Sequence, residues 1–241
     1  PAYLSQVLGA LEQPGVGAVT CLYAGRGDAG FWSQVDAAII SWSAAPKVMM
    51  ALMTGIAAPC MGSTIALRRE TLDQIGGFER FADVLADDYA IGEAVHALGK
   101  QVAVPPMLVT HACTEASLGQ VWRHHLRWAV TIRGVAPMRH LGSGIVYAVP
   151  LALLAVPFAP LPGLGALACA LAVRLAAAVK IDRHAGRRTA PLWLLPLADC
   201  TEFAAFLASL AARTIDWRGG TLTMARKGRI ANRRPSLTET P

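Results

Sequence analysis

The sequence predicts an α/β domain followed by membrane helices. Short apolar strands and amphipathic helices alternate through residues 1–140, which is the pattern of an α/β layer. The composition then changes, because residues 144–179 contain a single charged residue, Arg174. The whole chain is 54% hydrophobic and 16% charged, whereas a soluble domain carries about 25% charged residues. This composition excludes an intrinsically disordered protein and favours association with a membrane.

Local signals define the first elements of the α/β part. Apolar residues at helical spacing predict a helix over residues 2–13, which ends at a Pro-Gly pair. The apolar run at 16–23 is short and bounded by turn residues, so it predicts a buried strand. Residues 31–53 are long and apolar and predict a helix that is broken near Pro46.

Four shorter elements complete the domain. We expect a strand at 63–67, and then a helix at 70–75 that stops at a Gly-Gly pair, the usual glycine cap. An amphipathic helix over 88–98 follows, and a strand at 102–104 precedes two prolines.

The segment from 141 to 212 holds the expected membrane helices. Turn residues divide 144–179 into two stretches of roughly 16 residues, slightly short for spans of about 20; they are Pro157, Pro160, Pro162 and Gly163. We expect a tight transmembrane hairpin here, with a long buried hairpin as the alternative. A third stretch at 191–212 carries Asp199 and Glu202 and has a basic C-terminal flank. A re-entrant or interfacial segment and a true span therefore both stay open for it.

The charge distribution predicts the partners of the chain. Residues 1–120 hold 6 Lys/Arg and 11 Asp/Glu, a balance of −5, whereas the rest holds 16 and 5, a balance of +11. The basic residues flank apolar runs, which is typical of the cytoplasmic side of a membrane and not of a nucleic-acid surface. We therefore expect a lipid bilayer as partner and no nucleic acid, with the loop 182–188 and a basic tail at 213–241 in the cytoplasm.

The five cysteines are widely spaced and form no Cys-x-x-Cys pair, so the sequence predicts neither a zinc ribbon nor a thioredoxin-type site. Scattered cysteines at apolar positions usually behave as small buried hydrophobic residues.

Asp87 and Asp88 form the most informative acidic pair. They stand directly before a predicted helix, where carboxylates commonly cap the helix N-terminus. Adjacent acids also raise each other's pKa, which would help one of them to act as a base. On local grounds the capping interpretation is favoured.

A basic and aromatic cluster lies at residues 122–128. Arg123, His124 and Arg127 share one face of a helix, where guanidinium and imidazole groups suit a diphosphate. The alternative is an amphipathic interfacial helix over 121–132, with tryptophan anchors.

Several other residues are not assigned a ligand role. A metal site at His124-His125 is not favoured, because adjacent residues do not face one ligand. His111 is more simply a structural histidine, and Asp28 and Asp36 do not stand in an Asp-x-Asp context.

Several short motifs occur together in one order. They are Cys60-Met61-Gly62-Ser63-Thr64, Arg68-Arg69-Glu70 with Ile75-Gly76-Gly77-Phe78, Ala86-Asp87-Asp88-Tyr89, and His124-His125-Leu126-Arg127-Trp128. The ordered set resembles the latter part of a GT-A glycosyltransferase (a nucleotide-diphospho-sugar transferase) of the ceramide glucosyltransferase family, family 21. It is most similar to the bacterial members associated with hopanoid biosynthesis. The resemblance covers residues 1–140, and Trp217-Arg218-Gly219 fits the family's membrane-bound C-terminus.

The resemblance implies roles for individual residues. Asp88 matches the acid that deprotonates the acceptor hydroxyl, and Asp87 matches the acid before it. Arg127 and Trp128 match the last two positions of the motif that binds the nucleotide-sugar diphosphate and shapes the acceptor site. The first position of that motif, Gln or Arg in the family, is His124 here. Gly62 is also expected to line the substrate site.

The implied reaction is inverting transfer of a sugar from a UDP-sugar to the hydroxyl of a membrane lipid, a ceramide or hopanoid-type acceptor. The resemblance implies a hexosyltransferase with a divalent cation, Mg or Mn, at the diphosphate. It places the metal-binding acids of a DxD-type motif upstream of this chain, so we expect a GT-A domain that lacks its first part. The catalytic part is expected on the cytoplasmic side of a bacterial inner membrane, in a multi-pass protein.

Two alternatives remain open. One is a processive polysaccharide synthase, which uses a similar acid and Arg-Trp pair but normally has more membrane spans. The other is a membrane scaffold or transporter fragment, in which Arg174, Asp199 and Glu202 would be pathway residues.

Overall fold

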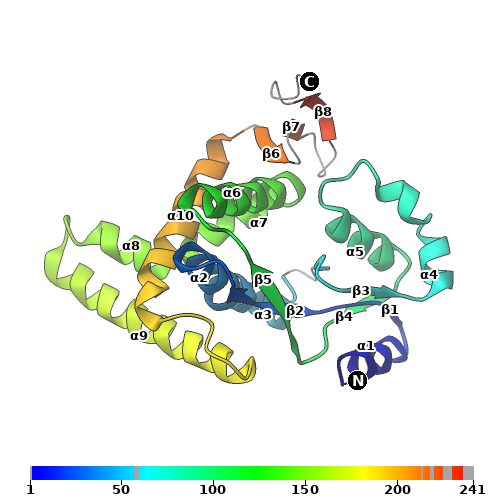
Figure 1. Ribbon diagram of the computed structural model, residues 1–241, viewed down its shortest axis with the longest axis horizontal. Coiled ribbons are helices and arrows are strands. Elements are labelled where there is room, and N and C mark those ends of the chain that lie inside the picture. Colours follow the sequence, from blue (N-terminus) through cyan, green and yellow to red (C-terminus); the bar gives the residue numbers. More distant parts are fainter. Residues whose placement is uncertain (1, 57–59, 213, 218–219, 225–229, 236–241) are drawn as a thin grey trace.

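The computed structural model describes residues 2–56, 60–212, 214–217, 220–224 and 230–235. Strands from the first half lie at the centre of the molecule, with the apolar helix of residues 31–54 and short helices beside them and the apolar helices of residues 148–211 toward one end (Figure 1). The predicted mixture of strands and helices, followed by apolar helices, is confirmed.

The central strands form two small sheets. In one, β1 (Val16–Thr20) pairs antiparallel with β3 (Ile65–Leu67) and parallel with β4 (Gln101–Ala103). In the other, β2 (Leu22–Gly27) runs parallel to β5 (Leu108–Cys113).

The single strand expected at 16–23 is therefore wrong. Two strands meet at the buried Cys21 and turn to different partners. The strand β5 was not predicted, because two prolines precede it and its residues do not alternate regularly between buried and exposed positions. Both differences depend on pairing with distant strands, which local periodicity does not register.

The shorter helices match the predictions. They are α1 (Ala2–Leu11), α4 (Arg69–Gln74) and α5 (Asp87–Ala97), and α4 is followed by Gly76 with φ 94°. The region expected as an interfacial helix is α6 (Leu118–Val135), which begins after Ser117, whose Oγ accepts a hydrogen bond from the Gln120 amide.

Residues 31–54 form one continuous helix, so the predicted break near Pro46 is wrong. It consists of α2 (Phe31–Ala38), a π-helical segment, η1 (Ile39–Ala44), and α3 (Ala45–Thr54). Pro46 lies at the start of α3, where the wider π segment accommodates a residue without an N–H. At 24 residues the helix is long and apolar enough to cross a membrane, which the sequence did not predict. The half nearest β2 is buried in protein, because Gly25 lets α2 approach: a Cβ there would lie 2.5 Å from Ala37 Cα.

The predicted hairpin at 144–179 does not consist of two helices of equal length. It starts with α7 (Pro137–Gly142), the 3-10 turn η3 (Ser143–Val146) and α8 (Ala148–Ala155), with a bend of 61° before α8. It continues as α9 (Pro160–His184), a 25-residue helix. Pro160 and Pro162 fall in the first turn of α9, where they are tolerated, whereas Pro157 lies in the turn before it, so the division shifts toward the N-terminus. As a result Asp182, Arg183 and His184 end α9 and do not lie in a loop.

The third apolar stretch consists of the 3-10 turn η4 (Leu192–Leu194) and α10 (Leu195–Ala211). Three helical regions in the described chain are long and apolar enough to span a membrane: Phe31–Thr54, Pro160–His184 and Leu192–Ala211. A fourth is possible if the bent pair at 137–155 counts as one span. The structure thus favours a span over a re-entrant segment at 191–212.

Four charged residues within these helices form two pairs. Arg174 on α9 donates two hydrogen bonds to Asp199 on α10, at 2.9 and 2.5 Å. Glu202 accepts from Lys47 at 2.7 Å and from Ser43. These groups hold helices together, which weakens the interpretation of them as pathway residues of a transporter.

The C-terminal segment contains a three-stranded antiparallel sheet of β6 (Thr214–Trp217), β7 (Gly220–Met224) and β8 (Ile230–Pro235). Arg218, Gly219 and several basic residues of the expected cytoplasmic tail lie outside the described residues; the latter are Arg213, Arg226, Lys227 and Arg229.

Candidate active site

The loop at Cys60–Gly62 is fixed to the end of β1. Thr20 donates from Oγ1 to the Met61 carbonyl at 2.9 Å and accepts from the Met61 amide at 2.8 Å. The other side of the loop contacts α5, since a Cβ on Gly92 would lie 2.8 Å from the Cβ of Cys60. This loop therefore holds Gly62 in a defined position beside the start of α5.

Asp88 is held at the N-terminus of α5 by two backbone amides. Its Oδ2 accepts a hydrogen bond from the Gly62 amide at 3.0 Å, and its Oδ1 accepts from the Tyr89 amide at 2.7 Å. A Cβ on Gly62 would lie 3.3 Å from Oδ2, so a side chain there would crowd the carboxylate. The sequence motif at Gly62 and the acidic pair are thus brought together, although 26 residues separate Gly62 from Asp88.

The surroundings of Asp88 favour a proton acceptor. Burial raises the pKa of this carboxyl above its ordinary 3.8, the Tyr89 amide opposes the shift, and the charge of Asp87 adds to it. Asp87 is exposed, and its Oδ1 accepts from the Asp88 amide at 2.9 Å. The two acids therefore differ: Asp87 supports the helix end, and Asp88 is a half-buried carboxylate with a raised pKa.

Tyr23 on β2 links Asp88 to the motif on α6. Burial raises the pKa of Tyr23 to about 12, and the nearby Asp88 charge adds to the shift. The Tyr23 ring meets Trp128 edge-on, with the centroids 6.3 Å apart, and lies 5.5 Å from His111. Tyr23 was not predicted as a site residue, because nothing near it in the chain marks it as one.

Arg127 is a half-buried cation one residue before Trp128. Burial lowers the pKa of its guanidinium, and the charge of Glu115 opposes the shift. Within the described part of the chain this guanidinium forms no ion pair or hydrogen bond. A partly desolvated guanidinium with free donors is suited to bind an anion such as a phosphate.

The two adjacent histidines of α6 face the same carboxylate, so the expectation that they could not is wrong. His125 Nε2 lies 2.6 Å from Asp36 Oδ1, and His124 Nδ1 lies 3.5 Å from the same oxygen. The two rings stack with their centroids 5.2 Å apart. Asp36 on α2 lies close enough to α6 for both rings to reach its carboxylate. No local signal marks Asp36, which is 89 residues away from His125.

His124 is directed toward acidic groups, since its Nδ1 also lies 3.0 Å from Glu115 Oε1. The carboxylates of Asp36 and Glu115 beside this nitrogen would repel a diphosphate, and contact between His124 and the donor stays a prediction. His111 on β5 is half-buried, and its ring lies 6.4 Å from that of His124. Burial lowers the pKa of His111, which favours the neutral structural histidine expected from the sequence.

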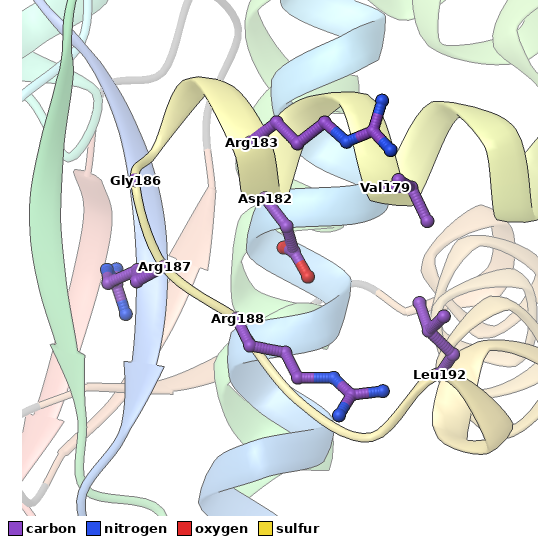
Figure 2. Close-up of a pocket in the computed structure, with 7 residues that line it drawn as sticks. All are labelled: Val179, Asp182, Arg183, Gly186, Arg187, Arg188 and Leu192. Carbon is purple, nitrogen blue, oxygen red and sulfur yellow. The ribbon is translucent and has the colours of Figure 1, made fainter.

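A hollow of about 490 Å³ lies elsewhere, at the end of α9. It is lined by Val179, Asp182, Arg183, Gly186, Arg187, Arg188 and Leu192. Figure 2 shows that its three arginine side chains point apart and do not converge on a common point. Arg187 instead donates to the Ala24 carbonyl at 2.9 Å, so we do not place the active site in this hollow.

A family model described as glycosyl transferase family 21 matches residues 1–230, which include the α/β part and the apolar helices. No curated protein and no solved structure gives a significant match.

Proposed function

The chain belongs to glycosyl transferase family 21, and from this premise we propose that it transfers a sugar from a UDP-sugar to the hydroxyl of a membrane lipid with inversion at the anomeric carbon. Membership in the family makes the chain a glycosyltransferase, and its apolar helices agree with a membrane location. We further propose that residues 1–140 are the latter part of a GT-A domain and that the acceptor is a ceramide or hopanoid-type lipid.

The observation that carries the proposal is the Asp88 carboxylate. It is half-buried, has a raised pKa and is fixed by the amides of Gly62 and Tyr89. In the proposed reaction it takes the proton from the acceptor hydroxyl as that oxygen bonds to the anomeric carbon. The bond between that carbon and the UDP oxygen breaks, and UDP leaves with the electron pair. A positioned base of this kind contributes about 10²–10⁴-fold in rate.

The α6 residues supply the remaining roles. Arg127 would bind the diphosphate of the donor and stabilise the charge that develops on it, because its guanidinium is partly desolvated and unpaired within the described chain. Trp128 lies beside Tyr23 and would form an aromatic wall for the acceptor.

The described residues do not fit the Mg²⁺ or Mn²⁺ ion that the resemblance implies at the diphosphate. The two groups of side chains that could hold an ion in the described chain both include Asp36, and neither includes Asp87 or Asp88. Both groups also contain nitrogen or sulfur donors, whereas Mg²⁺ prefers oxygen alone. The steps above therefore depend only on this chain's own residues.

We propose that the α/β part and the end of α9 lie in the cytoplasm of a bacterial cell, with the turn before α9 on the opposite side. Single cysteines at Phe158 and Ala185, in a chain whose five cysteines are replaced, test this orientation. An impermeant maleimide added to intact cells should label the first and not the second. Labelling of both, or of Ala185→Cys alone, would contradict it.

Product analysis tests the function itself. The full chain in lipid nanodiscs is given radiolabelled UDP-glucose or another UDP-hexose together with ceramide or a hopanoid, and the products are separated by extraction. Label should move to the organic phase as a lipid carrying one sugar, and boiled protein should give none. A water-soluble polymer would indicate a processive synthase, and absence of transfer from every UDP-hexose would refute the proposal.

A further inference from the structure

The five groups around Asp36 form a cluster that the transfer mechanism does not use. Asp36 comes from α2, His124 and His125 from α6, and Cys113 and Glu115 from the end of β5 and the loop after it. One potential ligand atom from each of Asp36, His124 and His125 lies within 4.8 Å of the other two, and the same holds for Asp36, Cys113 and Glu115.

The cluster is buried and its polar atoms are incompletely paired. Asp36 is fully buried, and the side chains of His125 and His124 are 4% and 11% exposed. Asp36 Oδ2 and His124 Nδ1 have no hydrogen-bond partner among the described residues. The contact of Nδ1 with Glu115, at 3.0 Å, has the distance of an ion pair but not the geometry of a hydrogen bond. Buried polar groups normally have partners, so these two orphaned atoms point to a missing ligand in the cluster.

The donor set indicates the kind of ligand. Both imidazoles face Asp36, Glu115 faces His124, and no Lys or Arg of the described chain forms an ion pair with Asp36 or Glu115. Imidazole nitrogen with carboxylate oxygen is a common ligand combination for zinc. Around a tetrahedral Zn²⁺ with bonds of about 2.0–2.1 Å, neighbouring ligand atoms lie about 3.3 Å apart. The separations of 3.0 and 3.5 Å bracket this value, and the 2.6 Å between His125 Nε2 and Asp36 Oδ1 is the length of a hydrogen bond.

We propose that Asp36, His124, His125 and Glu115 bind one Zn²⁺. The ion joins α2 to α6 and to the loop after β5, three segments that lie close together in Figure 1. The His124 ring also contacts Trp128 edge-on, with centroids 4.6 Å apart. The ion therefore fixes the helix that presents Arg127 and Trp128, and its role is positional.

Zinc content of the purified full chain tests the site without reference to glycosyl transfer. The chain in detergent is loaded with Zn²⁺, dialysed and analysed for metal, and its affinity is measured by competition with a chromogenic chelator. Glu115→Gln and His125→Ala remove one ligand each, and His184→Ala removes an exposed histidine at the end of α9 as the matched control. Far-UV circular dichroism checks the fold of each variant.

We expect one zinc per chain in the parent and in His184→Ala, undisturbed by an excess of Mg²⁺. Each ligand variant should bind zinc at least about tenfold more weakly, since even the groups that orient a ligand change affinity 10–100-fold. If His125→Ala does not fold, Glu115→Gln decides, because it replaces a partly exposed side chain by one of the same shape. The site is refuted if the parent holds no stoichiometric zinc, if Glu115→Gln binds as the parent does, or if Mg²⁺ displaces the zinc.

Discussion

Replacing Asp88 by Asn should abolish most of the transfer activity while leaving the fold in place. The carboxylate accepts one hydrogen bond from Gly62 at 3.0 Å and one from Tyr89 at 2.7 Å. The amide carbonyl of Asn can keep one of them, and its NH₂ group then faces the other amide. The loss of one hydrogen bond corresponds to about 1–2 kcal/mol of stability. For a chain of this size, that predicts a Tm lower by roughly 2–8 °C.

The effect on catalysis should be much larger. Loss of a positioned general base lowers kcat by about 10²–10⁴-fold, or roughly 3–5 kcal/mol in the activation free energy. The donor is bound by other residues, so its KM should stay close to that of the parent. This combination separates a base from a helix cap, because removal of a cap alone changes stability and not the rate of the chemical step.

The assay follows labelled sugar into lipid under saturating donor and acceptor, together with thermal unfolding of the same preparations. Asp83→Asn is the matched control, since Asp83 is an exposed acid shortly before the same helix. It should behave as the parent does in both measurements. If Asp88→Asn keeps kcat within threefold of the parent and shows only the lower Tm, Asp88 is a cap and the proposed mechanism is wrong.

Three further predictions concern the pH dependence of the reaction, the substrate-binding residues of α6 and the ion pair between α9 and α10. The pKa of Asp88 is raised above 3.8, and a base must be unprotonated to act. We therefore expect kcat to fall as the pH decreases through a value above 3.8. An acid limb of the pH profile at or below 3.8 would contradict this. Arg127→Lys keeps the charge but loses the planar fork, so UDP affinity measured by calorimetry should fall, whereas Trp128→Ala should raise the KM for lipid with UDP affinity unchanged. Equal UDP affinity in Arg127→Lys and the parent would instead leave α6 as a membrane anchor. Arg174→Met leaves the Asp199 carboxylate buried without its partner, so it should lower the free energy of unfolding by about 3–5 kcal/mol. Adding Asp199→Leu should recover most of that loss in the same unfolding assay. An unchanged Tm in the single variant would refute this.

Local sequence predicted the helices whose signals lie within a few residues of their ends. The glycine after α4 and the apolar spacing of α1 are examples, because capping and amphipathic burial act over one or two turns. The division of 144–179 was predicted only in part, for the opposite reason: Pro157 lies in the turn, but the turn ends before Pro160. Three prolines were counted as breaks, but α9 begins among them, and only the packing of α9 on α8 determines where the turn lies.

The candidate site was predicted in part. Asp88, Arg127, Trp128 and Gly62 were named from their motifs, and their roles stay predictions; the structure adds the hydrogen bond from the Gly62 amide to Asp88 and the contact of Tyr23 with Trp128. Asp36 was not assigned a role, because on its own it is an isolated acid in an apolar helix. Its importance arises only where α6 brings two histidines to it.

The sequence alone determined the family, the alternation of strands and helices, and the presence of apolar helices, because each depends on residue type and short-range order. The tertiary structure alone decided which strands pair and which charges meet. It placed Arg174 opposite Asp199, and both histidines of α6 on Asp36. Contacts of this kind join residues 25 to 89 positions apart. The path of the whole chain sets such contacts, and no pattern within a single helix or strand encodes them.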